Sequence, residues 1–201
     1  MQSKFNKIIW VAHQLYDRKL VTGTTGNISF KDDGYIYISQ SGSCFGLLDQ
    51  SSFAKLNINK DIIDGKPSKE YPLHLDLYNV SEANQVVIHT HSYYSTIVSC
   101  LKNEELIKGL FAYSPYLRMN TGGLVKKIGY QNPGSIELFA EFNAAVDKDT
   151  KVYILSNHGI VITAKDIIEA FNLIEEFETS AKMLIEIKKF NENDFGTISK
   201  L

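Results

Sequence analysis

The sequence predicts an α/β protein whose central sheet is mixed and largely antiparallel, with helices on both faces. Apolar residues recur at helical spacing near both ends of the chain. Short apolar or alternating segments typical of strands lie between them, and hairpin patterns mix with strand–helix alternation. A chain of 201 residues with 44% hydrophobic content and no internal repeat or linker is expected to form a single domain over 1–201.

The first half of the chain is expected to open with a helix, because Phe5, Ile8, Ala12 and Leu15 follow the spacing of a buried helical face. Past the Gly-rich turn TGTTGN, the segments ISF and YIYIS flank the turn KDDG and predict a β-hairpin. A further short strand near AKLNI ends at the turn signal DGKP. The stretch EYPLHLDLYNV then predicts a helix over 70–80, with a proline early enough to be tolerated.

The second half is expected to alternate strands and helices. The run VVI predicts a buried strand, and residues 135–146 predict a helix. Within 152–163, the segments VYILS and GIVIT predict two strands. An apolar stripe over 167–184 predicts a last long helix, whose start is expected at a capping signal formed by Thr163 and Asp166.

Charge and composition exclude several classes of protein. With 21 basic and 23 acidic residues the net charge is −2, and no basic block suggests a nucleic acid or a membrane surface as partner. No apolar run approaches the roughly 18 residues that a membrane span needs, and the first residues lack a signal-peptide core. Cys44 and Cys100 have no metal or disulfide spacing, so a cytoplasmic location is expected.

Three histidines are candidate metal ligands. His89 and His91 follow the apolar run VVI, and residues two apart on a strand point to the same face. Such a pair is also common in ordinary cores, where each ring is hydrogen-bonded and has no chemical role. His158, in the motif SNHG between two predicted strands, stands where packing histidines are unusual. Three neutral imidazoles that leave a position open are the pattern of a catalytic zinc site, whereas a structural zinc has four protein ligands.

Glu70 is the candidate acid or base. In KPSKEYPLH it follows a turn, where a carboxylate could reach the metal and transfer protons. The alternative is that it only complements the dipole at the start of the predicted helix. His74 shares a helix face with Glu70 and is interpreted as structural unless metal ligation requires it.

Two Gly-rich turns could bind an anion. TTGNIS contains Gly26 and Asn27, and QSGSCFG contains Ser41 and Gly42 next to Ser43. Exposed backbone N–H groups and hydroxyl donors in such turns suit a phosphate, although hairpin turns use the same residue types. Ser68 and Lys69 could supply two more donors, one of them charged.

Taken together, the ordered motifs GTTGNIS, SQSG, KPSKE, HTH and SNHG, over roughly 20–185, resemble the class II aldolase and adducin family, which includes fuculose-1-phosphate aldolase and ribulose-5-phosphate 4-epimerase. The segments SGSCFGLLD, HTHSYYSTIVSCL, SPYLRM and EEFETSAK look most like its 3-oxo-tetronate 4-phosphate decarboxylase branch. Lys69 is the sharper marker, because the sugar-phosphate aldolases of the family more often have a serine there.

The resemblance implies a three-layer α/β/α sandwich and a site made of identified residues. His89, His91 and His158 would bind a divalent metal, typically zinc, and Glu70 would be the acid/base residue. The residues at positions that bind the substrate phosphate in the aldolases are Gly26, Asn27, Ser41, Gly42 and Ser68. Several members are homotetramers with the site near a subunit boundary, so a homo-oligomer is expected.

The resemblance is weakest over 104–134. Tyr113, Tyr116 and Arg118, which fall in that segment, are therefore only candidates for residues that close over a neighbouring site, and they could equally pack.

The function implied is a metal-dependent carbon–carbon lyase that decarboxylates 3-oxo-tetronate 4-phosphate to dihydroxyacetone phosphate and CO2 through a metal-bound enediolate. Glu70 would manage the proton, and Lys69 could pair with the departing carboxylate or with the phosphate. One alternative is retro-aldol cleavage or 4-epimerisation of a ketose phosphate, which needs the same enediolate. A second is a non-catalytic, adducin-like domain, although this sequence retains the three histidines and the glutamate.

Overall fold

A computed structural model describes residues 2–102, 107–191 and 194–198. Within these residues eight strands form one sheet in the order β4-β3-β2-β1-β5-β8-β7-β6. The pair β6–β7 is parallel, and the other neighbouring strands are antiparallel. The strands are β1 (Asn27–Asp32), β2 (Tyr35–Ser39), β3 (Phe53–Asn57), β4 (Ile62–Asp64), β5 (Val86–Thr90), β6 (Lys126–Ile128), β7 (Val152–Leu155) and β8 (Gly159–Ala164).

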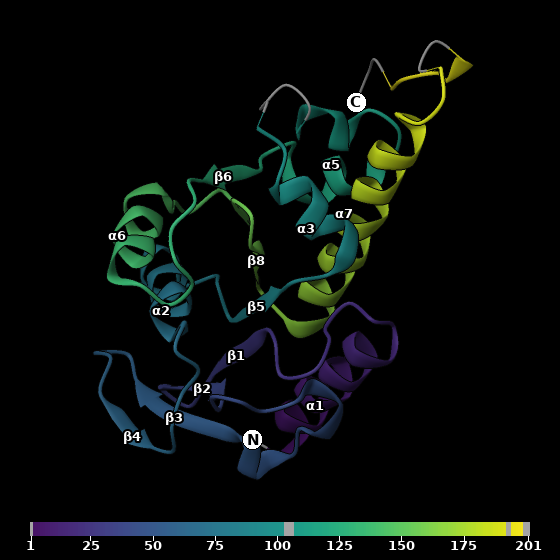
Figure 1. The fold of residues 1–201 in the computed structure, drawn as a ribbon. Coiled ribbons are helices and arrows are strands. Elements are labelled where there is room, and N and C mark those ends of the chain that lie inside the picture. Colours follow the sequence, from purple (N-terminus) through teal and green to yellow (C-terminus); the bar gives the residue numbers. More distant parts are fainter. Residues whose placement is uncertain (1, 103–106, 192–193, 199–201) are drawn as a thin grey trace.

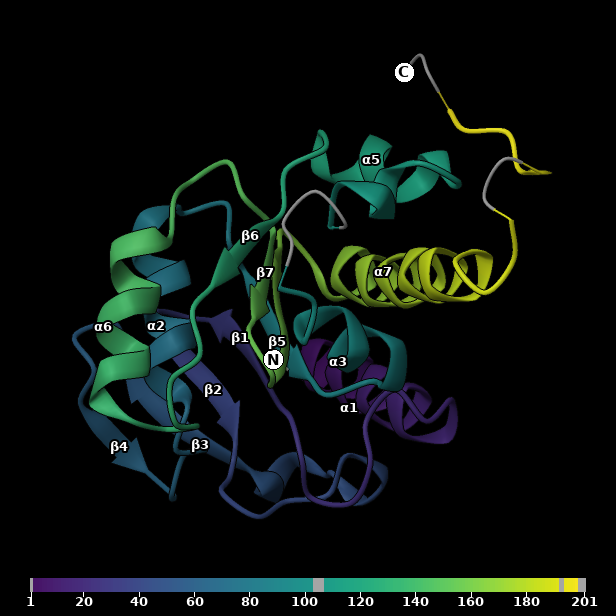
Figure 2. The same ribbon diagram turned by 45° about the horizontal axis from the view of Figure 1, so that its top comes forward.

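Helices cover both faces of this sheet, so the predicted three-layer α/β/α sandwich is confirmed. Figures 1 and 2 both place α2 and α6 on one side of the sheet and α1, α3 and α7 on the other. The helices are α1 (Gln2–Asp17), α2 (Tyr71–Val80), α3 (Tyr93–Ser99), α5 (Pro115–Thr121), α6 (Ile136–Ala145) and α7 (Ile167–Ile187), with single 3-10 turns at Phe45–Leu47, Gln50–Ser52 and Gly109–Phe111.

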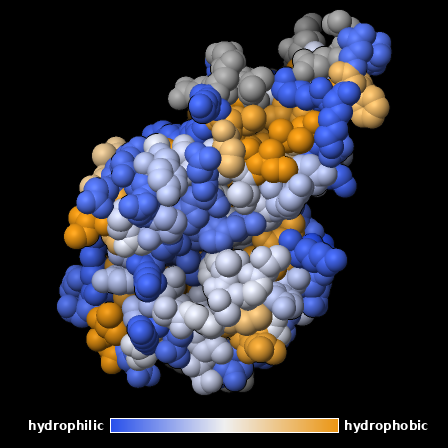
Figure 3. Space-filling view, in the orientation of Figure 1, coloured by the Kyte–Doolittle hydropathy of each residue, from blue (hydrophilic) through white to orange (hydrophobic). Residues whose placement is uncertain are grey.

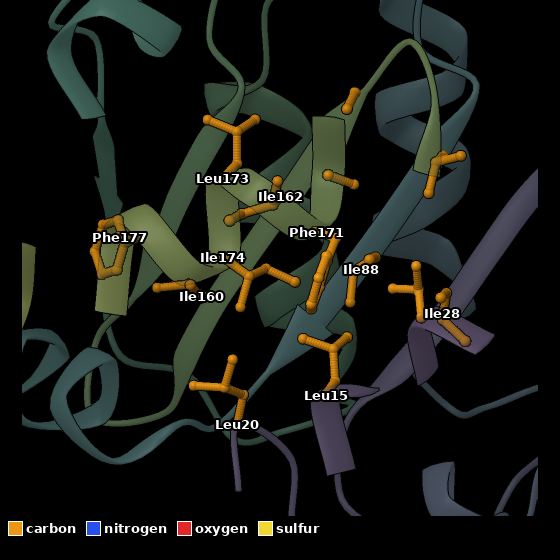
Figure 4. Packing of buried hydrophobic residues seen from close by; sticks show 14 of the residues in the cluster. Leu15, Leu20, Ile28, Ile88, Ile160, Ile162, Phe171, Leu173, Ile174 and Phe177 are labelled. Carbon is orange, nitrogen blue, oxygen red and sulfur yellow. The ribbon is translucent and has the colours of Figure 1, made fainter. Parts of the chain in front are cut away.

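Strand alternation divides the apolar side chains between two cores. On β5, Val86 and Ile88 belong to the core under α1 and α7, while Val87 belongs to the core under α2 and α6. Figure 4 shows the first core, where Phe171, Ile174 and Phe177 of α7 lie among the side chains of the sheet strands. Because successive side chains point to opposite faces, His89 lies on the Val87 side, facing the α2 layer.

Most of the predicted elements are present where the patterns placed them. The predicted capping signal is wrong in one part: Asp166 is the N-cap of α7 and accepts from the backbone N–H groups of Ile168 and Glu169, but Thr163 lies inside β8. Four elements have no counterpart in the predictions, namely β4, α3, α5 and β6. Each has three to seven residues, too few for a periodic pattern to be distinguished from a loop.

None of the described helices combines the length and the apolar character that are needed to cross a membrane.

We predict that Phe30→Ala lowers the free energy of unfolding by about 3–5 kcal/mol, because it leaves a cavity in an aromatic cluster. The Phe30 ring is fully buried, stacked on Tyr37 with centroids 5.3 Å apart and edge-on to Phe5 at 4.9 Å. Chemical denaturation measures the loss. Leu47→Ala is the control, since Leu47 is 80% exposed, and an equal loss in both variants would contradict the assignment of Phe30 to the core.

Candidate active site

The three histidines meet at one end of the β5–β8 pair. His89 is the fourth residue of β5, and His91 follows directly after the strand. His158 lies in the turn between β7 and β8, just before Gly159. The antiparallel register sets Thr90 opposite Ile160, so the end of β5 and the start of β8 lie side by side.

The Nε2 atoms of the three rings converge. His89 Nε2 lies 2.8 Å from His91 Nε2 and 3.3 Å from His158 Nε2, and one ligand atom from each ring lies within 4.8 Å of the others. Nitrogens bound at about 2.1 Å to a single tetrahedral ion are separated by roughly 3.4 Å. The cluster therefore has nearly the dimensions that a divalent metal requires.

The ring orientations suit metal binding as well. His89 Nδ1 donates to the carbonyl oxygen of Ile160 at 2.8 Å, which leaves the Nε2 lone pair of a neutral ring free. Asn157 turns the chain with φ of 54°, a left-handed conformation that asparagine tolerates. The His158 backbone N–H then donates to Leu155 O and to Ser99 Oγ, which fixes the turn against the end of α3.

A glycine allows His91 to approach this turn. A Cβ atom on Gly159 would lie 2.3 Å from the carbonyl oxygen of Thr90 and 2.8 Å from the His91 ring. These distances are below those of real Cβ contacts, so only glycine fits without displacing the backbone or the ring. Gly159 of the SNHG motif therefore allows the turn to pack closely against Thr90 and His91.

Helix α3 is held next to the cluster by a carboxylate from α7. Glu178 accepts hydrogen bonds from the backbone N–H groups of Tyr94 and Ser95, at 2.8 and 2.9 Å, and from the hydroxyl of Ser92. It thereby satisfies amides of the first turn of α3, which no residue of α3 could serve. Ser92 is the direct neighbour of His91, so α7 fixes the chain where it leaves β5 at His91.

Glu70, the N-cap residue of α2, faces the histidines. Its Oε2 atom lies 3.2 Å from His89 Nε2, and its Oε1 atom lies 3.4 Å from His158 Nε2. Burial alone would raise the pKa of this carboxyl group, but the charge and hydrogen bond of His89, together with His158 and His91, hold it well below its usual value. Glu70 is therefore an ionised carboxylate directed at the cluster.

The cluster favours one positive charge next to that carboxylate. Burial together with the charge of His89 lowers the pKa of His91 to about 3 and that of His158 to about 4, so both rings are neutral at neutral pH. Burial also disfavours a charged His89, yet Glu70 raises the pKa of His89 above its ordinary value.

Two buried polar atoms in this cluster, Glu70 Oε1 and His158 Nδ1, have no hydrogen-bond partner among the described residues. Two neutral imidazoles, a third that would release its proton on binding a cation, and a facing carboxylate with an unsatisfied oxygen are the donor set of a divalent metal site.

Backbone hydrogen bonds join the two remaining candidate segments. Ser41 N donates to Lys66 O, and Ser68 N donates to Ser39 O, so the turn after β2 runs beside the turn before α2. Gly26 lies against the end of β5, where a Cβ atom would be 2.7 Å from the carbonyl oxygen of His89.

One cavity of about 320 Å³ unites most of the candidates. It is lined by Gly26, Asn27, Ser41, Gly42, Ser68, Lys69, Glu70, His91 and His158 together with Thr24, Thr25, Gln40, Pro133 and Gly134. His89 is fully buried behind this lining. The sequence reasoning missed Pro133 and Gly134, although the turn signal NPG before α6 was available to find them.

The candidates of the weakly matched segment lie elsewhere. Tyr116 and Arg118 are on α5, and neither they nor Tyr113 belong to the lining of this cavity. Residues 104–106 of the segment lie outside the described residues. A role for Tyr113, Tyr116 and Arg118 in a neighbouring site stays a prediction.

Comparison with known proteins shows what the chain is similar to. Residues 6–185 match the family described as class II aldolase and adducin N-terminal domain. The L-fuculose phosphate aldolase of Methanococcus maripaludis is 38% identical over 178 residues, covering 87% of this chain and 92% of that protein. The 3-oxo-tetronate 4-phosphate decarboxylase of Pectobacterium atrosepticum is 33% identical over 200 residues, covering 96% and 91%.

Solved structures show the same fold. The crystal structure of YgbL from Escherichia coli, described as an aldolase, epimerase or decarboxylase, superposes with a TM-score of 0.87 at 29% identity and covers 98% of this chain and 94% of its own. A structure of L-fuculose 1-phosphate aldolase gives a TM-score of 0.77 at 25% identity, covering 95% and 89%.

We predict that Gly159→Ala lowers the amount of metal bound per chain by at least about tenfold at a fixed, limiting metal concentration, a loss typical of displaced support around a ligand. The added methyl group must displace the Thr90 carbonyl or the His91 ring. Elemental analysis after dialysis measures the metal content. Gly196→Ala is the control, because its Cβ would meet nothing within 4 Å, and full metal content in Gly159→Ala would show that the cluster does not depend on this close approach.

Proposed function

This chain belongs to the class II aldolase and adducin family, and from that assignment we propose that it is a metal-dependent lyase acting on a small phosphorylated sugar acid. The substrate proposed is 3-oxo-tetronate 4-phosphate, and the products are dihydroxyacetone phosphate and CO2. The observation that carries the proposal is the single cavity in which Lys69 lies next to Glu70, two histidines of the cluster and the Gly-rich turns.

The reaction needs a group that accepts an electron pair and a source of one proton. The bond between C1 and C2 breaks, CO2 leaves, and the electron pair moves to the oxygen of the 3-keto group, which gives an enediolate. A proton delivered to C2 completes dihydroxyacetone phosphate. A divalent metal held by His89, His91 and His158 would supply electrostatic stabilisation of the charge that develops on oxygen.

Glu70 is proposed as the residue that carries the proton. It lies at the cavity wall and touches two of the three histidines. Because decarboxylation consumes one proton, Glu70 would take it from solvent and deliver it to C2, a task that suits a carboxyl group within hydrogen-bond reach of the reacting carbon. His89, His91 and His158 are left as the metal ligands.

The turns that line the cavity are proposed to receive the phosphate. Gly26, Asn27, Ser41, Gly42 and Ser68 line the same cavity as Glu70. The carbon chain of a four-carbon sugar acid is short enough to reach from such a site to the histidine cluster in a cavity of about 320 Å³.

Lys69 is proposed to distinguish decarboxylation from aldol cleavage. Its side chain belongs to the cavity lining and forms no hydrogen bond or ion pair with another described residue. A cation there can pair with the carboxylate of a sugar acid and orient the bond that breaks. A ketose phosphate has no carboxylate to meet it.

Retro-aldol cleavage of a ketose phosphate is the second candidate. It is favoured by the 38% identity to an L-fuculose phosphate aldolase, and it needs the same enediolate, cluster and phosphate turns. The third possibility, a non-catalytic adducin-like domain, is not favoured, because Glu70 and the three histidines are in mutual contact.

The proposal extends to the identity of the metal, the oligomeric state and the cellular location. We infer that the ion is zinc, since three neutral imidazoles suit that metal. We infer a homo-oligomer, namely a tetramer, which a native mass measurement tests. Figure 3 shows apolar surface over the region where Figure 1 places α3, α5 and α7, and Met119 of α5 is 67% exposed. A cytoplasmic location is proposed from the composition alone.

We predict that His91→Ala loses both metal and CO2 release from 3-oxo-tetronate 4-phosphate, whereas Glu70→Gln keeps the metal but loses release by about 10²-fold or more, the usual contribution of a general acid or base. Metal content per chain and CO2 evolution are measured together. The matched control is His13→Ala, because His13 bonds Leu48 O away from the site.

Wild-type protein that binds metal but releases no CO2 would remove the decarboxylase assignment, and ketose-phosphate cleavage would then be assayed. Absence of bound metal from the wild type would overturn the whole catalytic interpretation.

We predict that Lys69→Ser lowers kcat/KM for decarboxylation by about tenfold to a hundredfold, the effect of losing one charged hydrogen bond, and leaves the metal content unchanged. Lys66→Ser is the control, since Lys66 lies in the same turn but outside the cavity lining. Decarboxylation kinetics equal to those of the wild type would remove the role proposed for Lys69.

A further inference from the structure

A buried polar stripe runs between α2 and β1, beginning at Glu70 next to the histidine cluster. Glu70, His74 and Tyr78 are four residues apart and therefore lie on one side of α2. Asn27 and Ser29, two residues apart on β1, face them. All five are buried, and the His74 side chain is completely inaccessible to solvent.

Hydrogen bonds link these five side chains into one continuous hydrogen-bond chain. Tyr78 Oη lies 2.6 Å from Ser29 Oγ, and Ser29 Oγ lies 2.7 Å from His74 Nδ1. His74 Nε2 lies 2.5 Å from Asn27 Oδ1. Asn27 Nδ2 in turn donates to Glu70 Oε2 at 3.3 Å. The chain thus ends on the carboxylate proposed to carry the proton.

The protonation state of His74 limits how this chain can run. Burial and the charge of His89, opposed in part by Glu70, lower the pKa of His74 to about 3. The ring is therefore neutral at neutral pH, so one nitrogen donates and the other accepts. The backbone of Val87 hydrogen-bonds to the Tyr78 oxygen, which leaves the Tyr78 proton for Ser29.

Only one donor-to-acceptor direction of these hydrogen bonds satisfies all five side chains. Tyr78 donates to Ser29, Ser29 donates to His74 Nδ1, and His74 Nε2–H donates to Asn27 Oδ1. If the chain ran the other way, the amide of Asn27 would be flipped and Oδ1 would face Glu70 Oε2 across 3.3 Å. Two acceptors, one of them charged, would then repel each other without a shared proton.

We propose that His74 is a positioning residue, which locks the Asn27 side chain with its NH2 group toward Glu70 and the substrate cavity. Asn27 lines that cavity, and an amide can present either an acceptor oxygen or a donor nitrogen to a ligand. With Nδ2 turned inward, Asn27 attracts an anion; with Oδ1 inward, it would repel one. The inference rests on the proposed function in one respect, that the anion received there is a phosphate.

The first test reads the tautomer directly. Nitrogen NMR of the metal-loaded wild-type protein, labelled at histidine and assigned with His74→Gln, is expected to show His74 neutral with its proton on Nε2 between pH 6 and 8. A proton on Nδ1, or a charged ring in this range, would overturn the inference whatever the protein catalyses.

The second test measures the affinity of the cavity for an anion. Calorimetry with inorganic phosphate is run on metal-loaded wild type, His74→Leu, His74→Gln and Tyr153→Phe. His74→Leu is expected to bind phosphate about tenfold more weakly with unchanged metal content, the cost of one misdirected hydrogen bond to a charged ligand. His74→Gln, which keeps a donor for Asn27, is expected to recover part of this affinity.

Tyr153→Phe controls for stability, because the buried Tyr153 hydroxyl accepts from Asp147 N and has no link to the cavity. It should lose stability and keep phosphate affinity. If His74→Leu does not fold, the tautomer measurement and the comparison of His74→Gln with the wild type still test whether His74 positions Asn27.

Phosphate affinity in His74→Leu equal to that of the wild type would overturn the positioning role and leave the proposed function intact. A wild type that binds no phosphate would instead overturn the phosphate-binding part of the proposed function, and with it the role given to Asn27 toward phosphate.

Discussion

The register of β5 between β1 and β8 is the constraint on which the site depends. It sets His89 opposite Asn27 on one side and Val161 on the other, and it brings the Ile160 carbonyl to the His89 ring. A shift of one residue would turn His89 toward the α7 core and Ile88 toward the cavity. The apolar side chains of β5 prevent that shift, because Val86 and Ile88 fill one core and Val87 the other. Packing in the two cores therefore determines where the histidine nitrogens of the candidate site lie.

The two faces of the sheet differ in the polarity of the side chains that they bury. Toward α7 the sheet face is largely apolar, whereas toward α2 it contains the stripe of Glu70, His74 and Tyr78 against β1. Burying five polar side chains is costly unless each has a partner, and here the hydrogen bonds run continuously from Tyr78 to Glu70. A stripe of this kind specifies one helix position on the sheet, since sliding α2 by a turn would leave several groups unpaired. The same contacts that orient α2 thus also orient the cavity wall.

Much of this arrangement could be predicted from the sequence, for identifiable reasons. The strand period of VVIHT and the turn composition of SNHG indicated where His89 and His158 would lie along their elements, and the ordered motifs indicated that they belong together. What could not be predicted depends on contacts between distant segments. Short elements such as α3 have no periodic signal, and Glu178, which holds α3, looks like any charged residue of a long helix. His74 was recognised as a neighbour of Glu70, but its partners on β1 become visible only when the helix is placed on the sheet.

The separation of the ligands along the chain has a consequence for folding. His89 and His158 are 69 residues apart in sequence, and their ring nitrogens meet only after β8 has paired with β5. In the unfolded chain the three imidazoles are dispersed, so an ion that needs all of them binds the native state alone. Such an ion raises the free energy of unfolding by an amount that grows with the logarithm of its concentration above the dissociation constant. A metal bound there would hold the two halves of the sheet together, and the thermal stability of this protein would then depend on the metal supply in its surroundings.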